Sequence, residues 1–280
     1  MKDIQISMHA ENLPIKQKFK HLFNLTRITV ILVTAASLLG LFWPKSVYPT
    51  AAIQQEYRVN DAVNLILGVP LILGPLWLTK KGKLSGLLLW PGALLFVLYT
   101  YTAYLFTLPF SFFSLLFLAI LFLSGWCFAG LIQWIDREAV AKKISANVPI
   151  LFPAILLLLF GVVFSTRAAA ILFQAFAGRA AISAVEMGTL AADIILSLVW
   201  IIGGISLLRR KTLGITFALG LLYTSLSLNV GLLILFCLQP LMTGAPFLLQ
   251  DTLVIAVFAC ISLAPFLSYL RAIFKTGISE

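Results

Sequence analysis

The sequence predicts an all-α membrane protein with eight transmembrane helices and both termini in the cytoplasm. Three observations support this fold class. The 280-residue chain contains eight apolar stretches, and most of them exceed the roughly 18 residues that cross a hydrocarbon core as a helix. The composition is 61% hydrophobic and 11% charged, with a mean hydropathy of +1.05. Basic residues fall mainly into alternate gaps between the stretches, and the positive-inside rule assigns those gaps to the cytoplasm.

The predicted spans follow one another closely along the chain. They cover residues 28–43, 62–79, 84–107, 110–134, 148–166, 190–208, 212–238 and 247–270. The gaps are too short for a separate soluble domain. The sequence therefore predicts an N-terminal cytoplasmic segment (1–27), a first four-helix unit (28–134), a cytoplasmic linker (135–147), and a second four-helix unit with a short cytoplasmic tail (148–280).

The charge distribution supports this topology. Sixteen of the 20 Lys and Arg residues lie in gaps assigned to the cytoplasm, and only Lys45, Arg58, Arg167 and Arg179 lie on the other side. In a soluble protein a net charge of +10 would suggest nucleic-acid binding. Here the excess follows from topology, so we expect contact with anionic lipids of the inner leaflet and no nucleic-acid partner.

The N-terminal segment contains a pattern typical of an interfacial helix over residues 12–23. Asn12 is suited to the cap and Pro14 to the first turn. An apolar stripe recurs at helical spacing and three lysines would meet lipid head groups: Ile15, Phe19, Leu22 and Phe23, with Lys16, Lys18 and Lys20. The segment is predicted to lie on the membrane surface.

The two four-helix units resemble each other weakly. Asp61 opens a span that ends at a basic turn around Lys81, and Asp193 opens a span that ends at a basic turn around Arg210. Because each unit holds four spans, two copies would have the same orientation and be related by a pseudo-twofold axis along the membrane normal. Chance similarity among leucine-rich helices is the alternative interpretation.

Glycine and proline predict helix breaks in both units. The second span contains two Gly/Pro pairs and the sixth contains a glycine pair: Gly68, Pro70, Gly74, Pro75, Gly203 and Gly204. Proline removes a backbone donor and kinks a helix. Interruptions at matching places in two halves indicate a binding site near the midplane of a transporter. Alternatively, these residues only help the helices to pack.

Polar residues at membrane depth form the predicted ligand-binding set, namely Arg58, Asp61, Asn64, Tyr101, Tyr104, Asp193 and Asn229. A carboxylate within a span usually faces a cavity or a cation. Asp193 lies about one turn inside its span and is the stronger candidate, with Arg167 or Arg179 as its expected protein partner and a coupling cation as the alternative. Asp61 is expected at a solvated rim, where it caps its helix or pairs with Arg58.

Tyr101 and Tyr104 share one helix face. They belong either to an interfacial aromatic belt or to an outer vestibule.

Catalytic signals are mostly missing from the sequence. His9 and His21 both precede the first span, and no metal-binding, nucleophile-elbow, phosphate-loop or dinucleotide motif is found. Neither a metal nor a cofactor is expected. An intramembrane aspartyl enzyme would require Asp61 and Asp193 to meet across the pseudo-axis.

One region resembles a known group of proteins. The motifs are VNDAVNLILGVP at 59–70, KGKL at 81–84, LWPG at 89–92 and LYTYTAYLF at 98–106. Together they resemble a group of uncharacterised bacterial multi-pass membrane proteins over residues 57–110. The resemblance implies a bacterial cytoplasmic (inner) membrane and no particular activity, so no functional residue is carried over.

The favoured function is binding or transport of a small solute or ion, or an accessory role to a transporter, through a helical bundle with an outer polar vestibule. A non-transporting scaffold or sensor is the first alternative. An enzyme that acts on a lipid or quinone within the membrane is the second. Both a homodimer and an unidentified accessory-subunit partner stay open.

Overall fold

The computed structural model of the protein describes residues 13–16 and 20–278. This part of the chain is helical throughout, without a named strand. The elements are α2 (Lys20–Phe42), α3 (Pro44–Val47), α4 (Ala51–Val63), η1 (Asn64–Gly68), α5 (Val69–Lys80), α6 (Leu84–Thr107), α7 (Phe112–Trp134), α8 (Arg137–Ile144), α9 (Leu151–Phe176), α10 (Ala184–Leu208), α11 (Thr212–Thr243) and α12 (Leu249–Ile278).

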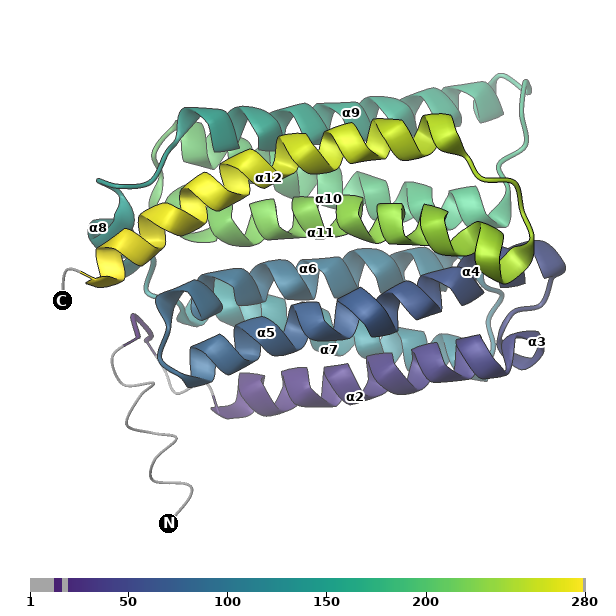
Figure 1. Ribbon diagram of the computed structural model, residues 1–280, viewed down its shortest axis with the longest axis horizontal. Helices are drawn as coiled ribbons and strands as arrows, with labels where there is room; N and C mark the ends of the chain where they lie inside the picture. The colour runs from purple at the N-terminus through teal and green to yellow at the C-terminus, as the bar shows by residue number, and fades with distance from the viewer. Residues whose placement is uncertain (1–12, 17–19, 279–280) are drawn as a thin grey trace, which may run out of the picture.

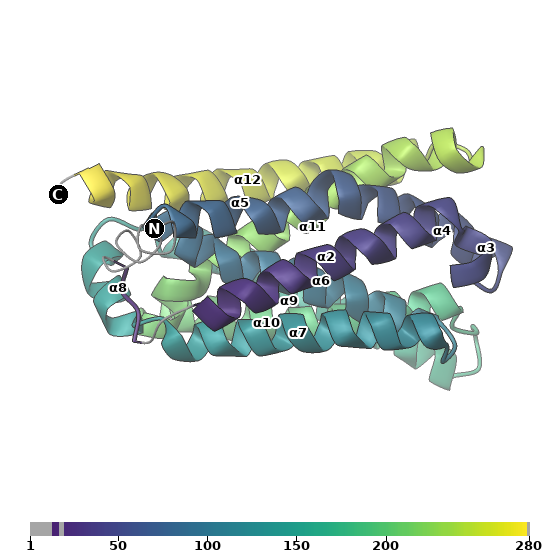
Figure 2. The same cartoon turned by 90° about the horizontal axis from the view of Figure 1, so that it is seen from below.

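Eight helical segments of the described chain are long and apolar enough to cross a membrane. This confirms the predicted number of spans. They lie side by side along the long axis of the bundle, and the start of α2 lies at the same end as the end of α12 (Figures 1 and 2). Many large apolar side chains point outward, for example Ile31, Phe122 and Leu159. The arrangement is that of an integral membrane protein, in which lipid covers such side chains.

Most helices extend further than predicted, and two extend the most. The second span begins at Ala51 instead of residue 62, because Thr50 is the N-cap and its side chain accepts a hydrogen bond of 3.3 Å from the backbone nitrogen of Ile53. The fifth span, α9, continues to Phe176 instead of ending at residue 166. Charged residues that the prediction left in loops therefore lie within helices.

α6 and α11 form the centre of the bundle and cross at two glycines. α6 is the most enclosed span and packs against α5, α7, α10 and α11. A Cβ atom at Gly92 of α6 would overlap the backbone of Gly220 of α11. The Thr224 hydroxyl donates to the carbonyl oxygens of Gly92 (2.9 Å) and Gly220 (3.0 Å). The two backbones approach this closely because neither position carries a side chain.

The predicted break in the second span is a π-helical turn, not an unwound segment. η1 covers Asn64–Gly68 and the helix continues through Pro70 and Pro75. Proline at position 70 has no N–H for an α-helical bond, and a wider turn precedes it. Gly74 has open space around it.

The predicted break at Gly203 and Gly204 is wrong, because α10 is one continuous α-helix. Both positions are close packing contacts. A Cβ atom at Gly203 would overlap the side chain of Leu221, and one at Gly204 would approach Leu158. The glycine pair therefore serves helix packing, which was the alternative interpretation.

Residues before the first span are only partly described. Leu13–Lys16 are not helical. They lie along the segment between α7 and α8, with Lys16 N donating to the Trp134 carbonyl (2.9 Å) and Asp136 N to the Pro14 carbonyl (2.9 Å). The helix predicted over 12–23 is therefore absent at these four positions. Residues 12 and 17–19 of that prediction lie outside the described residues.

The α5–α6 and α10–α11 turns have the same backbone structure. Gly82 and Arg210 occupy the same place in the two turns, and both have left-handed φ angles, of 72° and 51°. Three backbone hydrogen bonds recur in the same positions: Lys81 N to Trp77 O, Gly82 N to Thr79 O and Lys83 N to Leu78 O, against Arg209 N to Ile205 O, Arg210 N to Leu207 O and Lys211 N to Ser206 O. Gly92 and Gly220 follow these turns at equal distances along the chain.

Candidate functional site

Among the described residues, Asp61 and Asp193 are the buried charged residues, each with 1% of the whole residue's surface exposed. The prediction that Asp61 lies at a solvated rim is wrong, because α4 extends past it to Ala51. The predicted local pair with Arg58 is wrong too. Arg58 is exposed, and its Nε donates to the Leu41 carbonyl at 3.2 Å. Two carboxylates inside one apolar bundle require partners of their own.

Tyrosines hold Asp61. The hydroxyl of Tyr48 donates to Oδ2 through a short hydrogen bond, and the hydroxyl of Tyr104 donates to Oδ1 at 2.9 Å. Burial, and then the nearby Asp61 carboxyl, raise the pKa of Tyr48 well above its ordinary value, so this phenol stays protonated as a donor. Gly40 of α2 makes room for the group, because a Cβ atom there would overlap both the Asp61 carboxyl and the Tyr48 hydroxyl.

The Asp61 network continues through α4 and α6. The Tyr104 hydroxyl receives hydrogen bonds of 3.4 Å from the amides of Asn60 and Asn64. Tyr101 stacks on Tyr104 with ring centroids 5.4 Å apart, and its hydroxyl donates to the Val33 carbonyl at 3.4 Å. The two tyrosines therefore form a buried polar core between helices, rather than an aromatic belt in contact with lipid.

Asp193 is held by an ion pair. Nη1 of Arg167 lies 2.5 Å from its Oδ2, and the hydroxyl of Tyr99 donates to Oδ1 at 2.9 Å. The side chain of Arg167 is half exposed, whereas that of Asp193 is 2% exposed. Of the two arginines predicted as partners, Arg167 forms the ion pair with Asp193, whereas Arg179 lies in the exposed turn after α9. Asp193 connects α10, α9 and α6.

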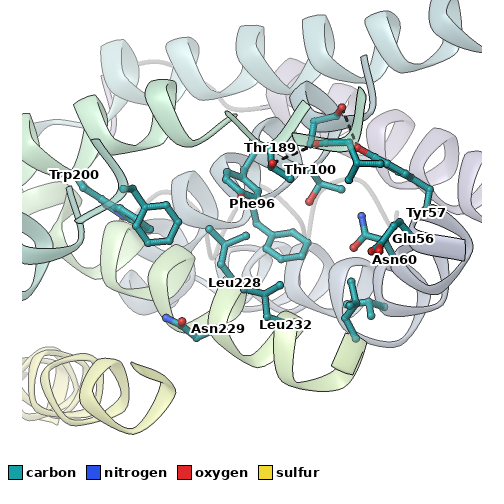
Figure 3. Close-up of a pocket in the computed structure, with 17 residues that line it drawn as sticks. Glu56, Tyr57, Asn60, Phe96, Thr100, Thr189, Trp200, Leu228, Asn229 and Leu232 are labelled. Carbon is teal, nitrogen blue, oxygen red and sulfur yellow. Dashed lines mark hydrogen bonds between the residues drawn. The ribbon is translucent and has the colours of Figure 1, made fainter. Parts of the chain in front are cut away.

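A cavity of about 140 Å³ lies between α4, α6, α10 and α11, with one residue from α9. Glu56 and Asn60 lie at one end and Trp200 at the other, with Phe96 and Thr100 between them (Figure 3). The lining consists of Glu56, Tyr57, Asn60, Val63, Phe96, Tyr99, Thr100, Ala103, Phe164, Val185, Thr189, Trp200, Leu228, Asn229, Gly231, Leu232 and Leu235. The cavity extends from Trp200, in the middle of α10, to Glu56, near the start of α4 and the α2–α4 connection.

The cavity lies between the two acidic networks without touching either carboxylate. Tyr99 lines it and donates to Asp193, while Asn60 lines it and donates to Tyr104, the partner of Asp61. Asp61 and Asp193 share no hydrogen-bond partner in the described chain. They do not form the close carboxyl pair that an aspartyl mechanism requires.

The predicted ligand-binding set is therefore divided by the structure. Asn229 lines the cavity, and its amide nitrogen donates to the Ser225 carbonyl (2.9 Å) and to Ser262 Oγ (3.3 Å). The other members of the predicted set do not line the cavity: Arg58, Asp61, Asn64, Tyr101, Tyr104 and Asp193.

Asn229 is the one lining residue that was in the predicted set, and three of the missed lining residues are Glu56, Asn60 and Tyr99. Glu56 and Asn60 were assigned to a loop, although their spacing of four places them on one helix face. Tyr99 points to another face of α6 than Tyr101 and Tyr104, so the face that those two tyrosines share does not include it.

The described residues contain no group of three or more His, Cys, Asp and Glu side chains that is able to hold a metal ion. Comparison with family models, with curated proteins and with solved structures finds no match to the chain. The resemblance over residues 57–110 therefore stays an expectation, and the site is interpreted from its own geometry.

Removing the acceptors at Asp61 is expected to destabilise the bundle. Asp61→Ala leaves the buried Tyr48 hydroxyl without its acceptor, at about 1–3 kcal/mol, and leaves the Tyr104 hydroxyl with only the more distant Tyr57 carbonyl at 3.4 Å. Asp61→Asn keeps one acceptor and should cost clearly less. Thermal unfolding in detergent measures the difference. Adding Tyr48→Phe and Tyr104→Phe to Asp61→Ala should recover part of the loss, because the unsatisfied hydroxyls are gone. Equal losses for Asn and Ala, without recovery, would contradict this role.

Proposed function

We propose that this integral membrane protein binds a small solute in the cavity between α4, α6, α10 and α11 and carries it across a bacterial cytoplasmic membrane. The observation that supports the proposal is a partly polar cavity inside an apolar bundle, walled by residues that two buried carboxylates hold in place. Buried polar networks of this kind are costly within a membrane and are typical of solute or ion pathways. The same residues would fix the shape of the cavity while a ligand enters and leaves.

The proposed orientation places both ends of the chain in the cytoplasm. Basic residues occupy the turns at one end of the bundle, at Lys80–Lys83 and Arg209–Lys211, and at Lys142 and Lys143 of α8. The opposite end, toward which the cavity extends, carries few of them. This asymmetry supports a cytoplasmic location for the basic end and an outer location for the cavity.

Contact with anionic lipids belongs to the same proposal. A surface hollow at the basic end is lined by Lys142, Arg210 and the first residue of α11, Thr212. Glu138 also lines it and reduces its positive charge. Lysine and arginine at this level favour the anionic head groups of the inner leaflet.

We further propose that the two four-helix units are related by a pseudo-twofold axis. The matching turns support the relation, and so does the crossing of α6 and α11 at Gly92 and Gly220, which occupy equivalent places in the two units. Residues that contact their own equivalents lie on a twofold axis. The crossing is therefore the proposed position of the axis.

Cysteine labelling in intact cells tests both the orientation and the cavity. In a cysteine-free background, Met187→Cys should react with a small impermeant thiol reagent and Ala146→Cys should not, because they lie at opposite ends of the bundle. Thr189→Cys, which lines the cavity, should also react. Its control is Ser197→Cys on the same helix, which is buried and does not line the cavity.

Labelling of Thr189→Cys no faster than Ser197→Cys would contradict an accessible binding cavity. Transport itself requires access from the other side as well, so Thr189→Cys should also react in inside-out vesicles. Reaction from the outer side alone would contradict transport and favour the sensor alternative.

A further inference from the structure

We propose that the cavity binds a small organic ammonium cation, with the carboxylate of Glu56 as its counter-charge and aromatic rings around its apolar part. The inference rests on the proposed function, because it takes the cavity to be the solute-binding site. Four features of the lining lead to this ligand class.

The first feature is charge. Glu56 is the one carboxylate of the lining, and no Lys, Arg or His residue lines the cavity. The nearest arginine in the networks, Arg167, is paired with Asp193 behind Tyr99. A ligand in this cavity therefore meets a negative group without a compensating positive one. This arrangement favours a cation and opposes an anion.

The second feature is the direction of the hydrogen-bond donors. The Tyr57 hydroxyl donates to the Ala103 carbonyl (3.2 Å), that of Tyr99 to Asp193 (2.9 Å), and the Asn229 amide to Ser225 and Ser262. The indole nitrogen of Trp200 is buried and has no hydrogen-bond partner among the described residues. Protein atoms already use the donors of Tyr57, Tyr99 and Asn229, and Trp200 Nε1 is buried. The cavity therefore presents mainly acceptors: the Glu56 carboxylate, which accepts one hydrogen bond of 3.4 Å from Gln239 Nε2, and the side-chain oxygens of Asn60 and Asn229. Acceptors match the N–H groups or the positive charge of an ammonium ion.

The third feature is aromatic content. Five of the lining residues carry aromatic rings: Tyr57, Phe96, Tyr99, Phe164 and Trp200. Phe164 and Trp200 contact each other edge to face, with centroids 5.3 Å apart. Aromatic rings attract cations through their electron-rich faces, and they recognise quaternary ammonium groups in this way. They also provide the apolar contact that the methylene or methyl groups of an organic ammonium ion require.

The fourth feature is size. A volume of about 140 Å³ is roughly ten times the space that one water molecule needs on the same measure. This suits a compact ligand of several non-hydrogen atoms and is too small for a lipid or a quinone. The Glu56 end and the Trp200 end are separated along the cavity, with Tyr57 beside Glu56 (Figure 3). The positive charge would therefore meet a carboxylate and an aromatic ring at one end, and the apolar part of the ligand would extend toward Phe96 and Trp200.

Binding of choline to the purified full-length protein tests the inference. The protein is kept in a maltoside detergent, which carries no ammonium group. Choline is compared with 3,3-dimethylbutan-1-ol, its uncharged carbon isostere, and with ethanolamine as a primary ammonium ion. At least one of the two cations should bind saturably, and the uncharged isostere should bind at least about 10-fold more weakly. Equal binding of isostere and choline, or no binding of either cation, would overturn the inference.

Substitution of the carboxylate locates the site. Glu56→Gln should weaken cation binding about 10- to 100-fold, because it removes the charge at nearly constant shape. The matched control is Glu186→Gln, which removes an exposed carboxylate at the same end of the bundle. Glutamine still serves the capping box with Ser183. Unchanged affinity in Glu56→Gln would overturn the assignment to this cavity. If Glu56→Gln does not fold, the isostere comparison on the unmodified protein decides.

The outcome is separable from that of the proposed function. If neither cation protects Thr189→Cys from labelling but an uncharged or anionic solute does, the cavity is a binding site for another ligand class. In that case only the present inference fails.

Discussion

Gly92→Leu is expected to prevent assembly of the bundle. At this position α6 and α11 cross with their backbones in contact, and a side chain would overlap the backbone of Gly220. The neighbouring atoms belong to main chain and have no rotamer that relieves the overlap. Separating the helices would also break the bonds from Thr224 to Gly92 and Gly220. We expect a loss of more than about 3 kcal/mol, seen as aggregation on size-exclusion chromatography.

Gly74→Leu is the matched control for this substitution. Gly74 also lies in a membrane-spanning helix, but it is exposed on the surface of the bundle and a Cβ atom there has no neighbour within 4 Å. The variant should fold and elute as the unmodified protein does. If both leucine variants fold equally well, the close crossing of α6 and α11 is not essential for assembly.

Arg167→Met is expected to cause the second large effect. It removes the partner of Asp193, a carboxylate that is 2% exposed, and leaves only Tyr99 to support it. Breaking a buried ion pair from one side costs about 3–5 kcal/mol, because the remaining charge has lost its compensation. The half-exposed position of Arg167 places the expected loss near the lower end of that range. Thermal unfolding in detergent measures it.

A double variant separates charge from packing at this site. Adding Asp193→Asn to Arg167→Met removes the uncompensated charge and keeps an acceptor for Tyr99, so most of the stability should return. Arg179→Met, in the exposed turn after α9, should have almost no effect and controls for the loss of a positive charge. If the double variant is no more stable than Arg167→Met, Arg167 acts through packing and not through its charge.

Hydropathy was sufficient to predict the number and order of the membrane spans, but not their ends. The predicted span started only at residue 62, although α4 begins at Ala51. The reason is that the first turns of α4 contain polar residues, which lower the local hydropathy: Glu56, Arg58, Asn60 and Asp61. In the structure Asn60 and Asp61 face other helices, and Arg58 bonds to the Leu41 carbonyl. A sequence window averages over all faces of a helix, so it cannot distinguish an inward polar face from a loop.

The candidate site was predicted in part for the same reason. Asp193 was expected to be supported by Arg167, Arg179 or a coupling cation, because burial of a lone carboxylate within a span is costly, and the structure pairs it with Arg167. The burial of Asp61 depends on Tyr48 and Tyr104, which come from other parts of the chain, and on the small residue Gly40 of α2. These contacts are set by how the helices pack, so their spacing in the sequence gives no signal.

The π-helical turn at Asn64–Gly68 rotates the side chains of α4 about the helix axis relative to those of α5. One additional residue in a turn rotates everything before it by about 100° relative to a regular helix. Glu56 and Asn60 line the cavity in this rotated setting. α10, the proposed counterpart in the second unit, is continuous and lacks the rotation. The proposed relation between the two units is therefore not exact: the first unit turns Glu56 and Asn60 toward the cavity, whereas the second unit holds Asp193 behind Tyr99.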